Sequence, residues 1–423
     1  MTTLIFLCPI DSLASFHSGI TSFIYFIMIG RLQEPDVVPS GLSAQKMTDT
    51  RTQTPRAVPQ PGSPEQQACN VCSDHMITVS WSEKAGWAAP ELKPLTNISL
   101  SPAASVLHYA TECFEGLKLY RGQDQKLRLF RPLLNCQRML RSATRISLPA
   151  FEPVELLALI ERLCAVDGPR WLPKDNTNGL LYVRPTLIGT EGGMGLKRPR
   201  EALLYIIIVS YPNHNPIAQP TVDLTTQDKK FSLFASHDQA VRAWPGGSGY
   251  AKIGANYGPA LHVQEEATRR GHDQVLWLFG PDSQVTEAGG ANFFAVVRNL
   301  SGEIELITAP LDDKTILAGI TRQSVLELAD AYLTEGSEHE LAPVTVAVRT
   351  LTMGEMILAY EQGRLLETFV VGTAYYITPV TEIDFRGRKI APLQSTYART
   401  LRNWIGGIQF GVEKHEWASI IKE

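Results

Sequence analysis

The segment "ALLYIIIVS" (residues 202–210) is the feature that most constrains how this chain folds. Its residues are apolar on both faces of an extended chain, which predicts a strand buried inside a sheet. The segment "LLYVRPTLIG" (180–189) also predicts a strand, and the glycine-punctuated stretch "TEGGMGLKRPR" predicts a loop between the two. The chain is therefore expected to contain a β-sheet with an apolar core.

Alternating β-rich and helical patterns continue from Ser73 to the C-terminus, without a repeat or a low-complexity break. Further strands are predicted at 274–280, 292–299, 303–309 and 343–350. Helices are predicted at 131–146, 153–166, 258–271 and 321–333. The expected fold class is α+β or α/β.

A mostly polar run with three prolines among its first ten residues begins at Tyr211 and predicts an interdomain connector at 211–222. We expect a small α/β domain at 69–215 and a larger domain at 216–423. Residues 1–68 are expected to form an N-terminal extension outside the fold, apolar at first and then disordered.

Composition narrows the class of partner. Hydrophobic residues make up 44% and charged residues 19% of the 423 residues, as in ordinary globular proteins. A net charge of −4 does not favour nucleic acid or an anionic membrane surface, so we expect small-molecule partners. The six cysteines indicate reduced thiols, and the lone C-x-x-C of Cys69 and Cys72 near His75 is a weak sign of a metal or redox site.

The first thirty residues are apolar and contain no Lys or Arg, so they match neither a secretory signal nor a mitochondrial presequence. The stretch from Ser12 to Gly30 approaches the length of a membrane span, but His17 and several hydroxyl residues dilute it. We expect the working start at Met47 and favour a cytoplasmic protein over a membrane-anchored one. A mitochondrial location stays open.

Four features suggest one chemistry. Lys252 lies among small residues in "GGSGYAKIGANYGPAL" (246–261), and Glu287 precedes an apolar strand. Gly319 precedes a helix whose first N–H groups, at Ile320 and Thr321, are free to bind an anion. Gly372 and Thr373 form a second hydroxyl-bearing turn. Each feature alone fits ordinary structure, but together they match pyridoxal 5′-phosphate, which needs a Schiff-base lysine, a partner for its ring nitrogen and an anion cradle.

Five collinear segments carry a family resemblance: 107–122, 127–143, 181–189, 241–261 and 315–329. Through them the chain resembles the branched-chain amino acid aminotransferases, a group of fold type IV pyridoxal-phosphate enzymes related to D-amino acid aminotransferase. The resemblance runs from about Asp74 to Ala418. It implies two domains with the cofactor between them, and a homodimer that completes the pocket.

The resemblance also implies residue roles. Lys252 would be the catalytic base and bind the cofactor covalently, Tyr257 would contact the cofactor's phenolic oxygen, and Glu287 would pair with its ring nitrogen. The residues expected to hold the phosphate are Arg138, Ile320, Thr321 and Thr373. The residues expected to bind the substrate are Tyr109, Phe114, Tyr182, Arg184 and the Ala374 amide. No metal is implied.

The implied reaction moves an amino group from a branched-chain or related hydrophobic L-amino acid to 2-oxoglutarate, giving a 2-oxo acid and glutamate. Three places depart from the family pattern: Cys72, Gly290 and the connector at 211–217. These changes around the side-chain pocket suggest an alternative, a specialised aminotransferase for a larger or more polar substrate. A catalytically silent paralogue with a binding role is the second alternative. The absence of a G-x-G-x-x-G after a strand argues against a nicotinamide-binding fold.

Overall fold

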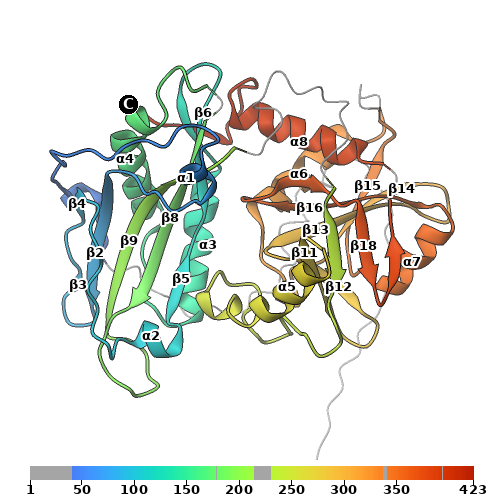
Figure 1. The fold of residues 1–423 in the computed structure, drawn as a ribbon, viewed down its shortest axis with the longest axis horizontal. Helices are drawn as coiled ribbons and strands as arrows, with labels where there is room; N and C mark the ends of the chain where they lie inside the picture. Colours follow the sequence, from blue (N-terminus) through green and yellow to red (C-terminus); the bar gives the residue numbers. More distant parts are fainter. Residues whose placement is uncertain (1–40, 178, 214–229, 337–340, 393) are drawn as a thin grey trace, which may run out of the picture. The chain divides into compact units, whose positions relative to one another are not determined.

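Two sheets organise residues 41–423 of the computed structural model, which does not describe residues 178, 214–229, 337–340 and 393 (Figure 1). The first sheet contains ten of the described strands, and all of its pairings are antiparallel except that of β1 with β4. Its strands run in the order β1 (Thr48–Asp49), β4 (Glu91–Pro94), β2 (His75–Ser82), β9 (Glu201–Ser210), β8 (Leu180–Gly189), β6 (Leu117–Arg121), β7 (Leu127–Phe130) and β20 (Ala418–Ile420). In addition, β3 (Gly86–Trp87) pairs with β2, and β5 (Glu112–Phe114) pairs with β8.

Two helices, α3 (Pro132–Arg145) and α4 (Pro153–Trp171), pack against the first sheet (Figure 1). Both begin with a proline at the first helical turn, where its missing N–H costs no hydrogen bond. Leu156, Leu159 and Leu163 of α4 are fully buried in one core with residues of β2, β8 and β9. Three shorter helical segments lie in the same half: η1 (Ala44–Lys46), α1 (Pro64–Gln67) and α2 (Ser105–Tyr109).

The second sheet is mixed and also contains ten of the described strands. Its order is β15 (Val344–Val348), β14 (Ile304–Thr308), β13 (Ala291–Arg298), β12 (Gln284–Ala288), β11 (Gln274–Phe279), β10 (Ser232–Ala235), β18 (Glu382–Phe385) and β19 (Arg388–Ile390). Strand β16 (Leu365–Gly372) pairs with β13 and with β17 (Tyr376–Pro379). The remaining helical segments are η3 (Gly254–Asn256), α5 (Ala260–Arg269), α6 (Ile320–Tyr332), α7 (Met353–Glu361) and α8 (Thr396–Gln409).

Strand β13 shows why this half has two apolar layers. Phe293, Ala295 and Val297 belong to a core shared with α7, whereas Phe294 and Val296 belong to a core shared with α6 and α8. Successive side chains of a strand point to opposite faces, so a strand covered on both sides must be apolar throughout. The second sheet is therefore covered on both faces.

Every predicted strand and helix named above is present, with small differences at the ends. Helix α4 is longer than predicted and continues to Trp171. The burial of β9 differs from the prediction: its residues alternate between buried and partly exposed positions, so only one of its faces is fully covered. The reason is that α4 packs on one face of this sheet and leaves the other partly open.

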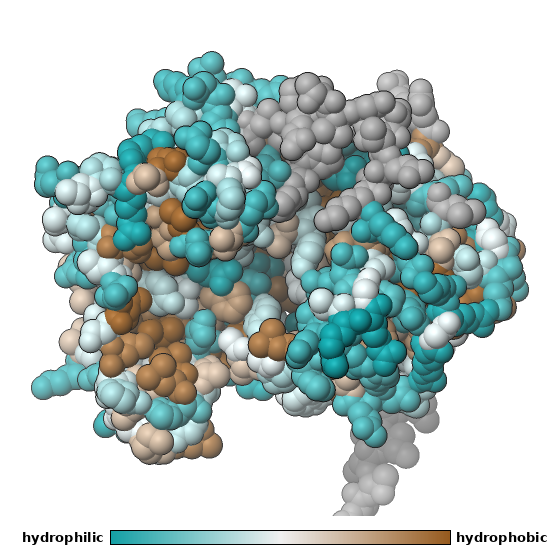
Figure 2. Space-filling view, viewed as in Figure 1, coloured by the Kyte–Doolittle hydropathy of each residue, from teal (hydrophilic) through white to brown (hydrophobic). Residues whose placement is uncertain are grey.

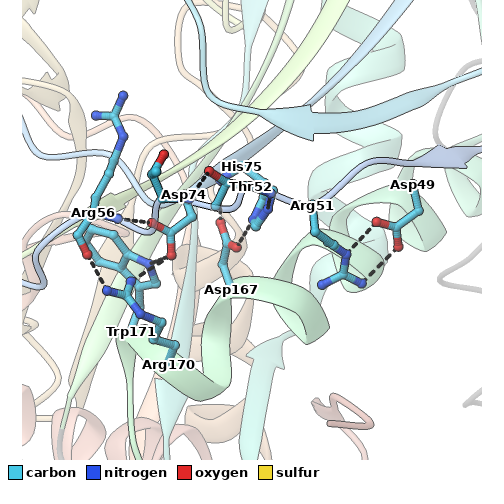
Figure 3. A network of polar contacts seen from close by, with 10 residues as sticks. Asp49, Arg51, Thr52, Arg56, Asp74, His75, Asp167, Arg170 and Trp171 are labelled. Atoms are coloured by element: carbon cyan, nitrogen blue, oxygen red, sulfur yellow. Dashed lines mark hydrogen bonds and ion pairs between the residues drawn. The ribbon is translucent and has the colours of Figure 1, made fainter.

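The segment 41–68 corrects one expectation, because it is packed against the first sheet rather than disordered. Thr48 and Asp49 pair with β4, and Leu42 is buried in the first core. Figure 3 shows the polar contacts that hold the chain just after β1. The backbone N–H of Thr52 donates to His75 Nε2 at 3.0 Å, and His75 Nδ1 lies 2.6 Å from Asp167 of α4.

Those contacts indicate which ring nitrogen of His75 donates a hydrogen bond. Since Nε2 accepts a hydrogen bond, the proton of the ring is on Nδ1 and points to Asp167. Asp74 extends the network, because it accepts hydrogen bonds from the backbone N–H of Arg56 at 2.6 Å and from the Trp171 indole at 2.9 Å (Figure 3). The extension outside the fold is thus shorter than 1–68.

Residues 1–40, including the apolar stretch Ser12–Gly30, lie outside the described residues, as does the connector from residue 214 to 222. Among the helices that are described, none has the length and apolar character needed to span a membrane. The division at 215/216 stays a prediction. The last strand, β20, pairs with β7 of the first sheet although it lies at the end of the predicted second domain.

Candidate active site

Lys252 lies in the segment between β10 and η3, where its amine approaches Tyr257. The distance from Lys252 Nζ to the Tyr257 hydroxyl oxygen is 3.3 Å. The backbone of Lys252 is held by Ser142 of α3, whose hydroxyl accepts its N–H at 2.8 Å, and by Phe114, whose N–H donates to its carbonyl at 3.1 Å. The amine is therefore positioned from the first sheet, α3 and η3 together.

Three predicted substrate residues lie beside this amine. Lys252 Nζ is 4.9 Å from the centre of the Phe114 ring, and the guanidinium of Arg184 is 4.5 Å from the same ring. Arg184 donates to the Tyr182 hydroxyl at 3.1 Å. Arg184 and Tyr182 are two residues apart on β8 and so project from the same face of the first sheet. The structure brings Phe114, Tyr182 and Arg184 together with Lys252.

Glu287 is buried on β12, 2% exposed, and its two oxygens have different surroundings. Oε1 accepts the backbone N–H of Leu317 at 3.1 Å and the Asn292 amide at 3.3 Å. Oε2 forms an ion pair with Arg242 at 2.6 Å but accepts no hydrogen bond among the described residues. A buried carboxylate oxygen with an unused acceptor position fits a protonated ring nitrogen.

Burial raises the pKa of Glu287, although the positive charges of Arg242 and Lys252 oppose the rise. A further cation beside Glu287 would favour its ionised form. A protonated pyridine ring is such a cation, so the electrostatics of this carboxylate fit the predicted cofactor.

The predicted phosphate residues form an anion cradle at the start of α6. Gly319 is the N-cap of α6 and supplies no side-chain cap, so the first N–H groups of the helix are free to bind a ligand. A Cβ atom at Gly319 would lie 2.0 Å from Asn292 Oδ1, so any other residue would displace the Asn292 amide that contacts Glu287. Ile320, Thr321 and Thr373 line one cavity of about 30 Å³.

Arg138 reaches the same helix start from α3. Its Nη1 donates to the Ala318 carbonyl at 3.0 Å, while Nε and Nη2 donate to the two oxygens of Glu115 at 2.7 and 2.9 Å. Glu115 is fully buried. Burial disfavours its ionised form, but the ion pair with Arg138 outweighs that effect and holds the pKa of Glu115 below its usual value.

The two remaining predicted residues are placed differently. Ala374 follows Thr373 in the turn after β16, and its carbonyl accepts a hydrogen bond from Lys118 Nζ at 3.5 Å. Tyr109, at the end of α2, donates its hydroxyl to the Met194 carbonyl. Within the described part of the chain, Tyr109 forms no hydrogen bond or aromatic contact with Lys252, Phe114 or Arg184.

Three ionisable residues at the site had no predicted role: Glu115, Lys118 and Arg242. Glu115 and Lys118 lie in "CFEGLKLY", where a charged residue inside an apolar strand pattern was the available signal. Arg242 lies in "VRAWPGG", a loop pattern with no such signal. Their partners come from distant segments, so only the fold reveals them.

The positions that depart from the family pattern have distinct settings. Cys72 forms an isolated β-bridge with Val209 and is partly buried. A Cβ atom at Gly290 would meet no other atom within 4 Å, so the chain leaves open space there. Cys69 and Cys72 are free thiols, and burial raises the pKa of both.

The chain is similar to known proteins of one family. A family model described as amino-transferase class IV matches residues 112–383. The chain is 42% identical to the cytosolic branched-chain-amino-acid aminotransferase of Saccharomyces cerevisiae over 390 residues, which cover 90% of this chain and 98% of that protein. It is 40% identical to the mitochondrial branched-chain-amino-acid aminotransferase of Rattus norvegicus over 384 residues, 90% of this chain and 92% of the relative.

Solved structures show the same fold. The branched-chain amino acid aminotransferase from Thermobaculum terrenum in its PLP form superposes with a TM-score of 0.61 at 20% identity. The superposition covers 82% of this chain and 98% of that one. The arrangement of two sheets is thus a known fold.

Proposed function

The chain belongs to the class IV aminotransferase family, and on that premise we propose that it transfers amino groups between branched-chain L-amino acids and 2-oxoglutarate, with pyridoxal 5′-phosphate as cofactor. The observation that carries the proposal is the position of the Lys252 amine, 3.3 Å from the Tyr257 hydroxyl and beside the Phe114 ring. Glu287, buried and with an acceptor position unused, supports the same cofactor.

Each side chain of the site has a separate role in the proposed reaction. When bound, pyridoxal 5′-phosphate supplies an electron-withdrawing ring that accepts the electrons released as the substrate loses its Cα proton. Lys252 Nζ takes that proton as a general base and returns it as a general acid. Tyr257 orients the lysine amine through its hydroxyl, and Glu287 would keep the ring nitrogen protonated. The α6 N-terminus, Arg138 and Thr373 would hold the phosphate.

The substrate would lie on the face of the first sheet that carries Phe114, Tyr182 and Arg184. Phe114 offers an apolar wall for a branched side chain, whereas Arg184 offers a cation for the second carboxylate of 2-oxoglutarate or glutamate. An amide at Ala374 would bind the carboxylate next to Cα. The open space at Gly290 is the feature that would favour a larger substrate in the specialised alternative.

A homodimer is part of the proposal. Leu107, Met194 and Leu196 are 58%, 63% and 87% exposed, and Figure 2 shows hydrophobic side chains gathered where α2 lies in Figure 1. An exposed apolar surface of this kind is typical of an interface. Tyr109, which donates a hydrogen bond to the Met194 carbonyl, would then line the substrate pocket of the second copy. We also propose the two domains at 69–215 and 216–423, and a cytoplasmic location.

Substrate profiling with the purified full-length protein tests the proposal. We expect the highest kcat/KM with leucine, isoleucine and valine as donors to 2-oxoglutarate, and the loss of turnover in Lys252→Ala. The exposed Lys389, changed to alanine, is the matched control and should keep the wild-type rate. Highest kcat/KM with a larger or polar amino acid would favour the specialised alternative. No turnover of any amino acid by the wild-type protein would favour the silent paralogue.

A further inference from the structure

Lys118 is a buried lysine at the anion cradle for which the reaction described above has no role. It lies on β6 and is 3% exposed. Its side chain lines the same cavity of about 30 Å³ as Asn135, Ile320, Thr321, Thr373 and Tyr376. The cavity has room for more than one water molecule. Lys118 thus lies beside three of the four residues expected to hold a phosphate.

The surroundings of Lys118 leave its charge without an anion. Among the described residues, no carboxylate oxygen lies within 4 Å of Lys118 Nζ. The amine is 3.7 Å from the centre of the Tyr376 ring and 5.5 Å from that of Tyr211, and it donates to the Ala374 carbonyl at the long distance of 3.5 Å. Ring faces and one carbonyl only partly replace the water that a buried ammonium group loses.

The other cation of the cradle is already neutralised. Arg138 uses two of its nitrogens for the buried carboxylate of Glu115, so the pair carries no net charge. A phosphate monoester carries −1.5 to −2 charges near pH 7. Helix N–H groups contribute only about half a positive charge. Without a further cation the cradle would bind a dianion in a buried site of nearly neutral charge.

We propose that Lys118 supplies this missing charge and binds the phosphate group of the cofactor, in addition to Arg138, Ile320, Thr321 and Thr373. The inference rests on the proposed function, since it concerns the cofactor of that reaction. The Lys118 amine on β6 and the N-terminus of α6 would then bind the same phosphate group.

The charge of Lys118 depends on pH. Burial lowers the pKa of Lys118 to about 7, so in the free site its charge is lost as pH rises through that value. The other ionisable groups facing it are the phenols of Tyr120 on the same strand, Tyr182 on β8, Tyr211 after β9 and Tyr376 on β17. Burial raises the pKa of Tyr120, Tyr211 and Tyr376. Phosphate affinity should therefore fall as pH rises above about 7.

The test compares two ligands that differ only in the phosphate. Equilibrium dialysis of the full-length protein measures the Kd of pyridoxamine 5′-phosphate and of pyridoxamine, neither of which bonds covalently to Lys252. We expect Lys118→Met to raise the Kd of pyridoxamine 5′-phosphate by about 10–100-fold. The Kd of pyridoxamine should not change. Lys118→Arg should restore the affinity and abolish its decline between pH 7 and 9, because arginine stays charged. The exposed Lys126, changed to methionine, is the matched control.

Equal weakening of both ligands by Lys118→Met would overturn the proposal, since it would show a general effect on the pocket. An unchanged Kd for pyridoxamine 5′-phosphate would also overturn the proposal. If the KM for 2-oxoglutarate rose in the same variant, Lys118 would instead bind a substrate carboxylate. Failure of the proposed function looks different, because then the wild-type protein would bind neither ligand and would turn over no amino acid.

Discussion

Charged side chains buried near Lys252 are arranged in pairs, and the pairing determines what each one can do. Glu115 and Arg138 neutralise each other, and Arg242 compensates Glu287 through one oxygen only. A buried ion pair adds little stability by itself, but removing one partner leaves the other charge uncompensated. The loss in free energy of unfolding when one partner is removed therefore measures how well the pair is shielded from water.

Glu115→Gln should lower the free energy of unfolding by about 3–5 kcal/mol. The glutamine can still accept a hydrogen bond from Arg138, but it carries no charge to balance the buried guanidinium. Urea unfolding followed by circular dichroism measures the effect. Glu91→Gln makes the same chemical change at an exposed ion pair with Lys93 and should leave the midpoint nearly unchanged. Equal midpoints for the two variants would show that Arg138 is hydrated.

Some site residues were predicted from a local signature and others only through the family resemblance, whereas the missed residues depend on partners from distant segments. Lys252 stands out among small residues, and Gly319 marks a helix start. Glu115 and Arg242 become recognisable only when α3 and β12 bring their partners to them. Gly249 shows a further limit, since a Cβ there would lie 2.5 Å from that of Ala243. Packing around the loop therefore favours glycine here, which the pattern of small residues alone does not reveal.

At the scale of elements, the segment 51–56 depends on polar contacts rather than on an apolar face. Residues 51–56 read as a disordered tail because they are polar and include a proline. Their order comes from His75 of β2 and from Asp74 just before it, which accept the backbone N–H groups of Thr52 and Arg56. Asp167 of α4 in turn holds His75. A composition rule counts only the residues of the segment, so it does not detect partners supplied by a distant helix. Amphipathic helices such as α3 were predicted well because their pattern is local.

Asp167→Asn should loosen this segment. Asp167 accepts both the backbone N–H of His75 at 3.0 Å and its ring N–H at 2.6 Å. An asparagine would turn its NH₂ group toward one of these donors, at a cost of about 1–3 kcal/mol. Trypsin cleavage after Arg51 and Arg56 should become at least about fivefold faster. The exposed Asp175, changed to asparagine, should leave the rate unchanged; the same rate in both variants would show that apolar contacts suffice.

At the scale of the molecule, the two sheets are joined by contacts that run through the site. Arg138 donates a hydrogen bond to the Ala318 carbonyl, and the Ser142 hydroxyl accepts one from the Lys252 N–H. Cys113 forms an isolated β-bridge with Ile253. The described residues accordingly belong to one compact unit. Sequence patterns predicted the strands but not their order, because nothing local indicates that β20, the last strand, returns to β7. The C-terminal strand therefore couples regions that the predicted boundary at 215/216 separates.

This coupling predicts one cooperative unfolding transition that the C-terminal strand controls. Ile421 is 4% exposed in the core of the first sheet and donates its N–H to Leu127 at 2.9 Å, whereas its neighbour Ile420 is 46% exposed. Ile421→Ala should cost about 2–5 kcal/mol, and Ile420→Ala much less. Because α8 packs on the second sheet just before β20, hydrogen exchange in Ile421→Ala should accelerate in β13 and β16 as well as in β6 and β7. Faster exchange confined to the first sheet would show instead that the two halves unfold independently.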